Sequence, residues 1–326
     1  MQKLFRMVWQ AIYGIRVAVG KLFQGKDKTA PARRRDMSLK GEHAKMMSAA
    51  RHGNVEAQLQ LATAYSEGNG VAQDYGEAAH WFGEAAKQGN ASAQFSLAVC
   101  YANGQGVGQD YEEAVNWFRC AAEQGHVAAQ VSLAICLQKA LGAFASPVEA
   151  AKWFKLAAES GDAAGQMGYA SCLLHGVGVT PSAAEATSWL HQAAGQGSAE
   201  AAFNLGKCYQ DGVGVSHDAA EAFKWFRMAA GRGLPQAQYE LGLCYANGRG
   251  TEVERVAAYQ WISLAARRGI PGAEGVKNEL GEQMTPQEIA EAGRRIEQMG
   301  GAGRISTPVE TVEDEVVIQA PEAADA

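Results

Sequence analysis

The segment Ala-Ala-His-Trp-Phe-Gly-Glu-Ala-Ala-Lys-Gln-Gly, residues 78–89, recurs along this chain at an interval of 36 residues. Six of the seven tryptophans obey that interval: Trp81, Trp117, Trp153, Trp189, Trp225 and Trp261. A fixed period of about 20–50 residues is typical of stacked structural repeats rather than of one closed globular core. We therefore expect an array of repeated units, and such arrays usually act as binding surfaces.

The residues around each tryptophan predict a helix that ends at a glycine. An alanine stands three positions before the tryptophan, and an Ala-Ala pair stands four and five positions after it. These offsets describe one face of a helix. The glycine eight positions after the tryptophan suits a left-handed C-terminal cap; the six are Gly89, Gly125, Gly161, Gly197, Gly233 and Gly269.

The start of this helix carries a capping-box pattern. An N-cap residue is followed three positions later by glutamate in five units, beginning at Asp74, Asp110, Ser146, Ser182 and Asp218. In a capping box the cap oxygen accepts from the N3 amide, and the glutamate reaches back to the cap N–H. The sixth unit departs, with Glu254 and Ala257. We interpret these acids as structural and not as paired catalytic carboxylates.

An earlier helix precedes each cap. Two of its positions, one turn apart, repeat as Leu61/Tyr65, Leu97/Tyr101, Leu133/Leu137, Tyr169/Leu173, Leu205/Tyr209 and Leu241/Tyr245. A Gly-x-Gly turn joins the two helices, as in Gly68 and Gly70, except that the third unit has Ala140 and Gly142. Copies in identical register predict a repeated helix stop rather than a phosphate-binding loop.

The whole unit closely resembles the Sel1-like repeat (SLR) family, a relative of the tetratricopeptide repeats. The resemblance rests on Ala-x-x-x-Leu-Ala-x-x-Tyr-x-x-Gly-x-Gly-Val-x-x-Asp over residues 57–74 and Ala-x-x-Trp-Phe-x-x-Ala-Ala-x-x-Gly over 78–89. It implies an all-α, right-handed α/α solenoid that mediates protein–protein contacts and is not an enzyme. Bacterial members often serve in envelope, secretion or signalling assemblies. The six repeats are expected at 53–88, 89–124, 125–160, 161–196, 197–232 and 233–269.

Cysteine spacing and charge exclude several classes of function. Five cysteines share one register position, namely Cys100, Cys136, Cys172, Cys208 and Cys244, and Cys120 stands apart. Repeats stack on the order of 10 Å apart, whereas a disulfide needs Cα atoms within about 7 Å, so we expect free thiols in a reducing compartment. Without Cys-x-x-Cys spacing we expect no metal, and we find no cluster that predicts a cofactor or a small-molecule substrate. The net charge of −6, concentrated in the repeats, argues against nucleic-acid binding.

Residues 1–24 form a basic, aromatic-rich amphipathic segment. Its predicted membrane-facing residues are Leu4, Phe5, Val8, Trp9, Ile12, Ile15, Val19, Leu22 and Phe23. Such a helix lies in the membrane interface and is attracted by anionic lipids. Arg16 interrupts the apolar run that a spanning helix or a signal peptide needs, but export and docking on a protein partner stay open as alternatives.

The remaining segments flank the array. Residues 25–37 are predicted to be a polar basic linker, and 38–52 an N-terminal capping helix. Residues 270–300 are predicted to hold C-terminal capping helices, with Thr285 as an N-cap and Pro286 at N1. Residues 301–326 are acidic and without helical periodicity, which predicts a disordered tail. Within that tail, Glu313–Ile318 is either a short docking motif or part of a solubilising tail.

A partner is expected on the first helices, which line the concave face in tetratricopeptide arrays. Positions two residues before and two after the motif leucine are largely apolar there, and an exposed apolar stripe usually marks a contact site. The predicted column comprises Phe95, Val99, Val131, Ile135, Met167, Phe203, Lys207, Tyr239 and Leu243, with Lys139, His175 and Asp211 adding polar rim contacts. The alternative is that neighbouring first helices cover these side chains. The tryptophans are predicted to be buried core residues.

These observations favour a bacterial-type scaffold or adaptor that is peripheral to the inner membrane on its cytoplasmic side. The alternative is an exported envelope protein or secreted effector, periplasmic or extracellular, whose residues 1–24 act in export.

Overall fold

The computed structural model describes residues 43–301, and this range is helical throughout, without a strand. The predicted all-α fold is therefore confirmed. The chain divides into two compact units, Met1–Ser160 and Gly161–Ala326. The predicted membrane segment, the basic linker and nearly all of the acidic tail lie outside the described residues, as do the first residues of the predicted N-terminal capping helix.

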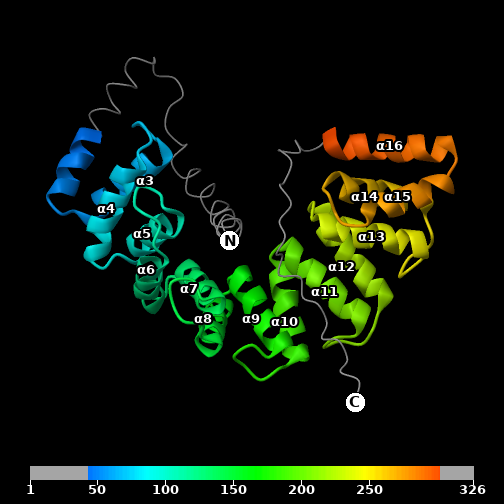
Figure 1. The fold of residues 1–326 in the computed structure, drawn as a ribbon, viewed down its shortest axis with the longest axis horizontal. Coiled ribbons are helices and arrows are strands. Elements are labelled where there is room, and N and C mark those ends of the chain that lie inside the picture. The colour runs from blue at the N-terminus through cyan, green and yellow to red at the C-terminus, as the bar shows by residue number, and fades with distance from the viewer. Residues whose placement is uncertain (1–42, 302–326) are drawn as a thin grey trace. The chain divides into compact units, whose positions relative to one another are not determined.

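Each unit is a series of helix pairs (Figure 1). After a helix over residues 43–51, the first unit contains α3 (Val55–Glu67) with α4 (Tyr75–Lys87), α5 (Ala91–Asn103) with α6 (Tyr111–Glu123), and α7 (Val127–Lys139) with α8 (Pro147–Glu159). The second contains α9 (Ala163–His175) with α10 (Ala183–Gly195), α11 (Ala199–Asp211) with α12 (Ala219–Gly231), α13 (Pro235–Asn247) with α14 (Arg255–Arg267), then α15 (Ala273–Glu282) and α16 (Pro286–Gly301). From α3 to α8, and again from α9 to α15, each helix packs against the next one along the chain, and α14 also packs against α16.

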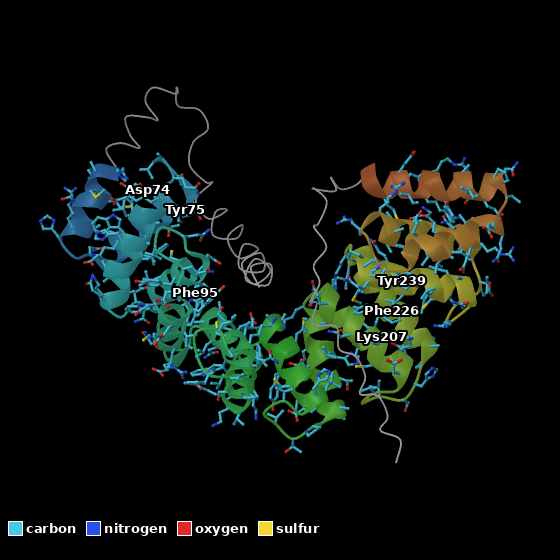
Figure 2. The ribbon with its side chains drawn as sticks, in the orientation of Figure 1. Asp74, Tyr75, Phe95, Lys207, Phe226 and Tyr239 are labelled. Carbon is cyan, nitrogen blue, oxygen red and sulfur yellow. The ribbon has the colours of Figure 1, made fainter. Side chains whose placement is uncertain are left out.

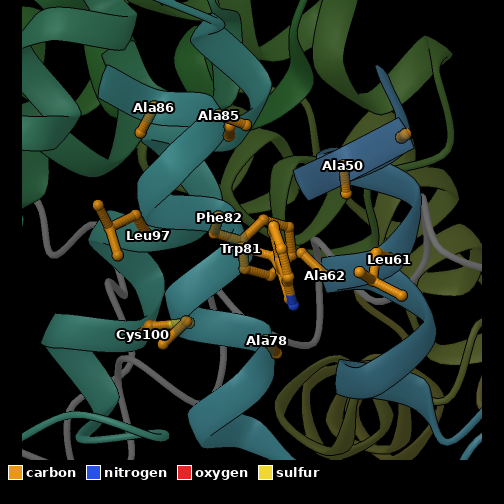
Figure 3. Packing of buried hydrophobic residues seen from close by; sticks show 13 residues of the cluster. Ala50, Leu61, Ala62, Ala78, Trp81, Phe82, Ala85, Ala86, Leu97 and Cys100 are labelled. Carbon is orange, nitrogen blue, oxygen red and sulfur yellow. The ribbon is translucent and has the colours of Figure 1, made fainter. Parts of the chain in front are cut away.

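Small residues let the helices of a pair approach closely. Ala78 and Ala85 of α4 are fully enclosed, as is the motif residue Leu61 of α3. In Figure 3 these side chains surround Trp81 and Phe82 in the core of the first repeat. The alanines thus act as contact points between helix backbones, and the larger side chains fill the space on either side of them.

The residue after each tryptophan is buried more deeply than the tryptophan itself. Phe118 and Ile262 are fully enclosed, whereas Trp117 and Trp261 are half-buried, and of the six only Trp81 is buried. The prediction that all six tryptophans are core residues is therefore wrong in degree. The physical reason is helix geometry: Phe118 is three or four residues from each of the other buried residues of α6 and lies at the centre of the buried face, whereas Trp117 lies at its edge. Trp81 Nε1 donates to the exposed Glu77, at 3.1 Å. Trp153 and Trp189 make the same bond to Glu149 and Glu185.

The capping-box prediction is half correct. Asp74 Oδ1 accepts from the N–H groups of Gly76 and Glu77, and Asp110 and Asp218 repeat this arrangement. The glutamates do not reach back, because the N–H of Asp74 already donates to the Tyr65 carbonyl at 3.0 Å. The corresponding backbone bond forms in all six pairs. Ser146 and Ser182 make no side-chain cap bond. A complete capping box occurs instead at α16, between Thr285 and Glu288.

The two glycines of each Gly-x-Gly turn have different roles. The first ends the helix in the left-handed region, and Ala140 takes that place in the third repeat with φ 54°. The second, Gly106 in the second repeat, also has positive φ, and it touches the preceding repeat: a Cβ there would lie 1.8 Å from the Tyr75 carbonyl oxygen. Gly142, Gly214 and Gly250 make equivalent contacts. The turn is therefore both a helix stop, as predicted, and a site of close packing between consecutive repeats.

Candidate protein interaction surface

The first-helix column is less exposed than the sequence predicts. Phe95, Val131 and Phe203 are only 8%, 7% and 7% exposed, so the predicted exposure of these three side chains is wrong. Phe95 packs against Phe118 of its own pair and stacks on His126, with ring centroids 4.7 Å apart. Phe203 packs against Phe226 in the same way. These side chains form part of the core between the two helices of a pair.

The other column residues are half-buried. These are Val99, Ile135, Met167, Lys207, Tyr239 and Leu243. Tyr239 and Leu243 pack against the cluster of Ile262, Ala265 and Ala273, so each of these two side chains is partly covered and partly exposed. We call the four of these residues that lie in the second unit, Met167, Lys207, Tyr239 and Leu243, the first-helix surface; Figure 2 labels Lys207 on α11 and Tyr239 on α13. A half-buried apolar side chain on a helix held in place by its neighbours is suited to contact a protein.

Charges on this surface join neighbouring first helices in the second unit. Lys207 Nζ lies 3.7 Å from Glu240 Oε1 of α13 and 4.0 Å from Asp211 Oδ2 of its own helix. Both Lys207 and Glu240 are largely covered, with side-chain exposures of 23% and 20%. The predicted rim residues Lys139, His175 and Asp211 are exposed at the ends of their helices. One cation flanked by two carboxylates gives this part of the surface a net negative charge.

A polar cluster lies on the second-helix side of the second unit. His191 Nε2 is 3.2 Å from the Tyr209 hydroxyl, and the imidazole lies edge-on to Trp225 at 5.3 Å. Burial lowers the pKa of His191, while Glu221 opposes that shift. The neutral imidazole can therefore accept from Tyr209 at neutral pH. The arrangement fixes packing between α10, α11 and α12.

All six cysteines are free, as predicted. Cys100, Cys136, Cys172, Cys208 and Cys244 are buried, and burial raises the pKa of Cys136 to about 12 and those of the other four to about 11. Such thiols stay protonated and behave as small apolar side chains. Within residues 43–301 no group of three potential ligands could hold a metal ion. No helix in the same range is long and apolar enough to cross a bilayer.

Comparison with known protein families identifies the repeat. The family model named "Sel1 repeat" matches six consecutive segments, at residues 55–90, 91–126, 127–162, 163–198, 199–234 and 235–270. The chain belongs to the Sel1 repeat family. Each matched segment begins at the first residue of a first helix, two residues after the corresponding boundary drawn from the sequence. Sel1 repeats commonly form protein-interaction scaffolds without catalytic activity.

Solved structures of Sel1 repeat proteins resemble this chain. One is a protective antigen of uropathogenic Escherichia coli that displays an SLR fold, with 32% identity and a TM-score of 0.72 over 80% of this chain and 57% of that one. Another is a Sel1 repeat protein from Oxalobacter formigenes, with 28% identity and a TM-score of 0.61 over 73% of this chain and 97% of that one. The chain thus spans little more than half the length of the antigen. None of the curated proteins compared matches it.

Sequence reasoning missed a glutamine ladder inside the Sel1 array. Gln58 and Gln94 are buried in first helices, and each accepts a bond from a glutamine 30 residues later: Gln88 Nε2 to Gln58 Oε1 at 2.8 Å, and Gln124 Nε2 to Gln94 Oε1 at 2.7 Å. The Gln166–Gln196 pair repeats it. A signal was present, because these glutamines also recur every 36 residues. The ladder is structural, since each amide joins the end of a second helix to its own first helix.

Proposed function

We propose that this Sel1 repeat protein is a non-enzymatic scaffold that binds a protein partner on the first-helix surface. The observation that carries the proposal is the row of half-buried side chains on successive first helices, with Met167, Tyr239 and Leu243 around the charged pair of Lys207 and Glu240. Apolar residues with few free rotamers supply contact area, and the carboxylates favour a partner with a basic side chain. The family's common role supports this proposal.

The test places a photoreactive group on the surface and on a matched position elsewhere. Replacing Tyr239 with p-benzoylphenylalanine in the source cell should yield a cross-linked protein adduct of defined mass. Met228, an exposed residue of α12, is the control position because it lies on a second helix. The proposal is wrong if Met228 yields the same adduct, or if Tyr239 yields none while Met228 does.

A substitution pair then distinguishes recognition from folding. Tyr239→Ala with Leu243→Ser should abolish the adduct formed from a probe at Met167 while helicity is retained. Phe203→Ala is not suitable, since Phe203 is buried against Phe226 and its loss would disrupt the pair. If the double variant still forms the adduct, the partner does not bind through α13.

We also propose that residues 1–24 hold the protein at an anionic membrane surface. Support comes from the sequence, which combines basic residues such as Lys3, Arg6 and Lys21 with Trp9 and other apolar residues. The purified full-length chain should float with phosphatidylglycerol vesicles and not with phosphatidylcholine vesicles at low salt. Changing the three basic residues to glutamine should remove flotation, and equal flotation of the variant would refute the electrostatic anchor.

The alternative role of residues 1–24 is export. The sequence of the mature N-terminus distinguishes the two, because an intact Met1 or Gln2 start supports an anchor, whereas a start between about residue 25 and residue 37 means cleavage. In that case the array is an envelope protein or a secreted effector, and flotation of the full-length chain has no bearing on the native protein.

A further inference from the structure

Three arginines gather at one edge of the last two repeats. Arg232 follows α12, and Arg267 and Arg268 end α14, so all three lie at turns from a second helix to the next first helix. Arg232 and Arg267 are exposed and Arg268 is half-exposed. We call these residues the arginine edge. The edge borders the first-helix surface, because a Cβ on Gly272, in the turn after Arg268, would lie 3.6 Å from the Tyr239 hydroxyl. The two proposals are tested separately, since footprinting of the purified chain needs no partner.

Two of the three arginines occupy positions that hold structural glutamines in other repeats. Arg232 and Arg268 align with Gln88, Gln124 and Gln196, which donate to the buried glutamine ladder. Opposite Arg268 the ladder is broken, because the Oε1 of Gln238 is buried without a partner. Gln130 has the same unpartnered oxygen opposite Ser160, so the missing bond is shared with the third repeat, but in the last repeat a half-exposed arginine stands in the donor's place.

None of the three guanidinium groups makes an ion pair or hydrogen bond within residues 43–301. Two acids stand in the first turns of α11 and α15, and each has another partner. Glu200 accepts from the Ser198 hydroxyl, and Glu274 pairs with Lys277. The Arg232 guanidinium also lies over the preceding turn, since a Cβ placed on Gly197 would be 3.7 Å from its Nη2. The edge therefore presents guanidinium groups without an ion-pair partner at two consecutive turns of the described residues.

The last described helix, α16, lies beside α14, which ends at this edge. Two contacts join α16 to α14: Arg295 Nη1 to Glu254 Oε1 at 2.8 Å, and Gln260 Nε2 to Met299 Sδ at 2.8 Å. Residue numbers rise in both helices from the first contact to the second, so α16 runs parallel to α14. Figure 1 shows the two helices side by side. Met299 thus lies beside Gln260, eight helical residues or about 12 Å from Arg268.

We propose that the acidic tail of this chain docks on the arginine edge through Glu310, Glu313, Asp314 and Glu315. The eight residues from 302 to 309 can span up to about 26 Å when extended, which exceeds the distance of about 12 Å from Met299 to Arg268. Guanidinium groups pair well with carboxylates, and a tethered segment has an effective concentration in the millimolar range. The tail then competes with any acidic partner that approaches this edge.

The test is arginine footprinting of the full-length chain. Phenylglyoxal modifies accessible arginines, and the rate at each site is read by mass spectrometry of peptides. In a variant with Glu310→Gln, Glu313→Gln, Asp314→Asn and Glu315→Gln, the edge should react at least about two-fold faster, the change expected if the tail covers it half of the time. Raising the salt to about 0.5 M should give the wild-type chain the same fast rate.

Two controls make the footprint specific. Arg249 is exposed in the turn between α13 and α14, at the opposite end of both helices, and its rate should not change. A variant with Glu322→Gln and Asp325→Asn, which neutralises only the distal acids, should leave the edge protected. The substituted tail residues lie outside the helices described between residues 43 and 301, so unchanged circular dichroism is expected.

Three results would overturn the proposal. Equal rates in the wild type and the neutralised variant would mean that the tail does not cover the edge. Protection that grows with protein concentration would assign the tail to a second copy of the chain. Faster modification of Arg33–Arg35 instead of the edge would show that the acidic tail pairs with the basic N-terminal linker.

Discussion

Adding one methyl group at Gly106 should destabilise the junction of the first two repeats more than the same change at Gly70. Both glycines stand second in their Gly-x-Gly turns, and both have φ 75°. An alanine in the left-handed region costs about 1–2 kcal/mol at either site. At Gly106 the new Cβ would also lie 1.8 Å from the carbonyl oxygen of Tyr75 and 2.2 Å from its carbon, whereas at Gly70 nothing lies within 4 Å.

The difference between the variants isolates the contact between repeats. Forcing a backbone apart to admit a methyl group is an overpacking change, which costs about 1–3 kcal/mol. Gly106→Ala should therefore lose about 2–5 kcal/mol in all and Gly70→Ala about 1–2 kcal/mol. Gly104→Ala is a second control, because the natural Ala140 occupies the same register position with φ 54°.

Hydrogen exchange is the appropriate assay, since a repeat array need not unfold in one step. Amides of α4 and α5 should exchange faster in Gly106→Ala, and the change should fade toward α7 and α8. Equal losses in Gly70→Ala and Gly106→Ala would refute the reasoning, since they would leave only the cost of the backbone conformation. An effect spread evenly over the first unit would also contradict the nearest-neighbour picture.

Three further predictions follow from burial and pKa. Phe118→Ala should cost about 3–5 kcal/mol in denaturant unfolding, and Trp117→Ala less, because Phe118 is fully enclosed and Trp117 is half-buried. Ellman's reagent at pH 8 should titrate one fast thiol, that of the exposed Cys120, and six after denaturation, because burial raises the other pKa values to about 11–12. The Arg119 guanidinium lowers the pKa of Glu149, so this pair stabilises the fold above the unfolded pKa and loses its effect as pH falls through the folded one. The difference in free energy of unfolding between the wild type and Arg119→Gln should therefore become smaller as the pH is lowered.

Each of these expectations has a clear contrary result. A larger loss for Trp117→Ala than for Phe118→Ala would restore the tryptophan as the main core residue. Two or more fast thiols in the native protein would mean that a buried position opens readily. A stability gap between wild type and Arg119→Gln that stays constant from about pH 7 to pH 3 would show that the ion pair, about a third exposed, contributes nothing measurable.

The sequence predicted the helices and the repeat because both depend on periodic apolar positions. The motif residues Leu61 and Leu97 and the Ala-Ala pairs are buried as predicted, and the terminal glycines have positive φ. These features are local to one repeat or follow from helix geometry. The prediction failed for Trp117 and Phe95, whose burial depends on which neighbouring side chain covers them. A one-dimensional period shows that a position recurs and does not show how deeply it lies.

The capping glutamates illustrate the same limit. Asp74 followed by Glu77 has the pattern of a capping box, but the Asp74 N–H donates to Tyr65 and the glutamate accepts from Trp81. That outcome requires knowledge of the turn between the helices, which brings the Tyr65 carbonyl to the cap. At Thr285 the preceding turn offers no such carbonyl bond to its N–H, and the full box with Glu288 forms.

Comparing repeats with one another separates structural from functional positions better than the period alone. Gly106, Gly142, Gly214 and Gly250 each lie against the backbone of the preceding repeat, so substitution there is costly. Gly70 and Gly178 share the positive φ, so the conformation of the turn also favours glycine.

The glutamine ladder is missing from three repeats, where Ser160, Arg232 and Arg268 stand in place of the donor glutamine. Gln130 opposite Ser160 and Gln238 opposite Arg268 each keep a buried oxygen without a partner, which costs about 1–3 kcal/mol. Because the loss occurs with serine as well as with arginine, it does not by itself explain the arginines. The charge of Arg232 and Arg268 at two consecutive turns is what supports docking of the acidic tail.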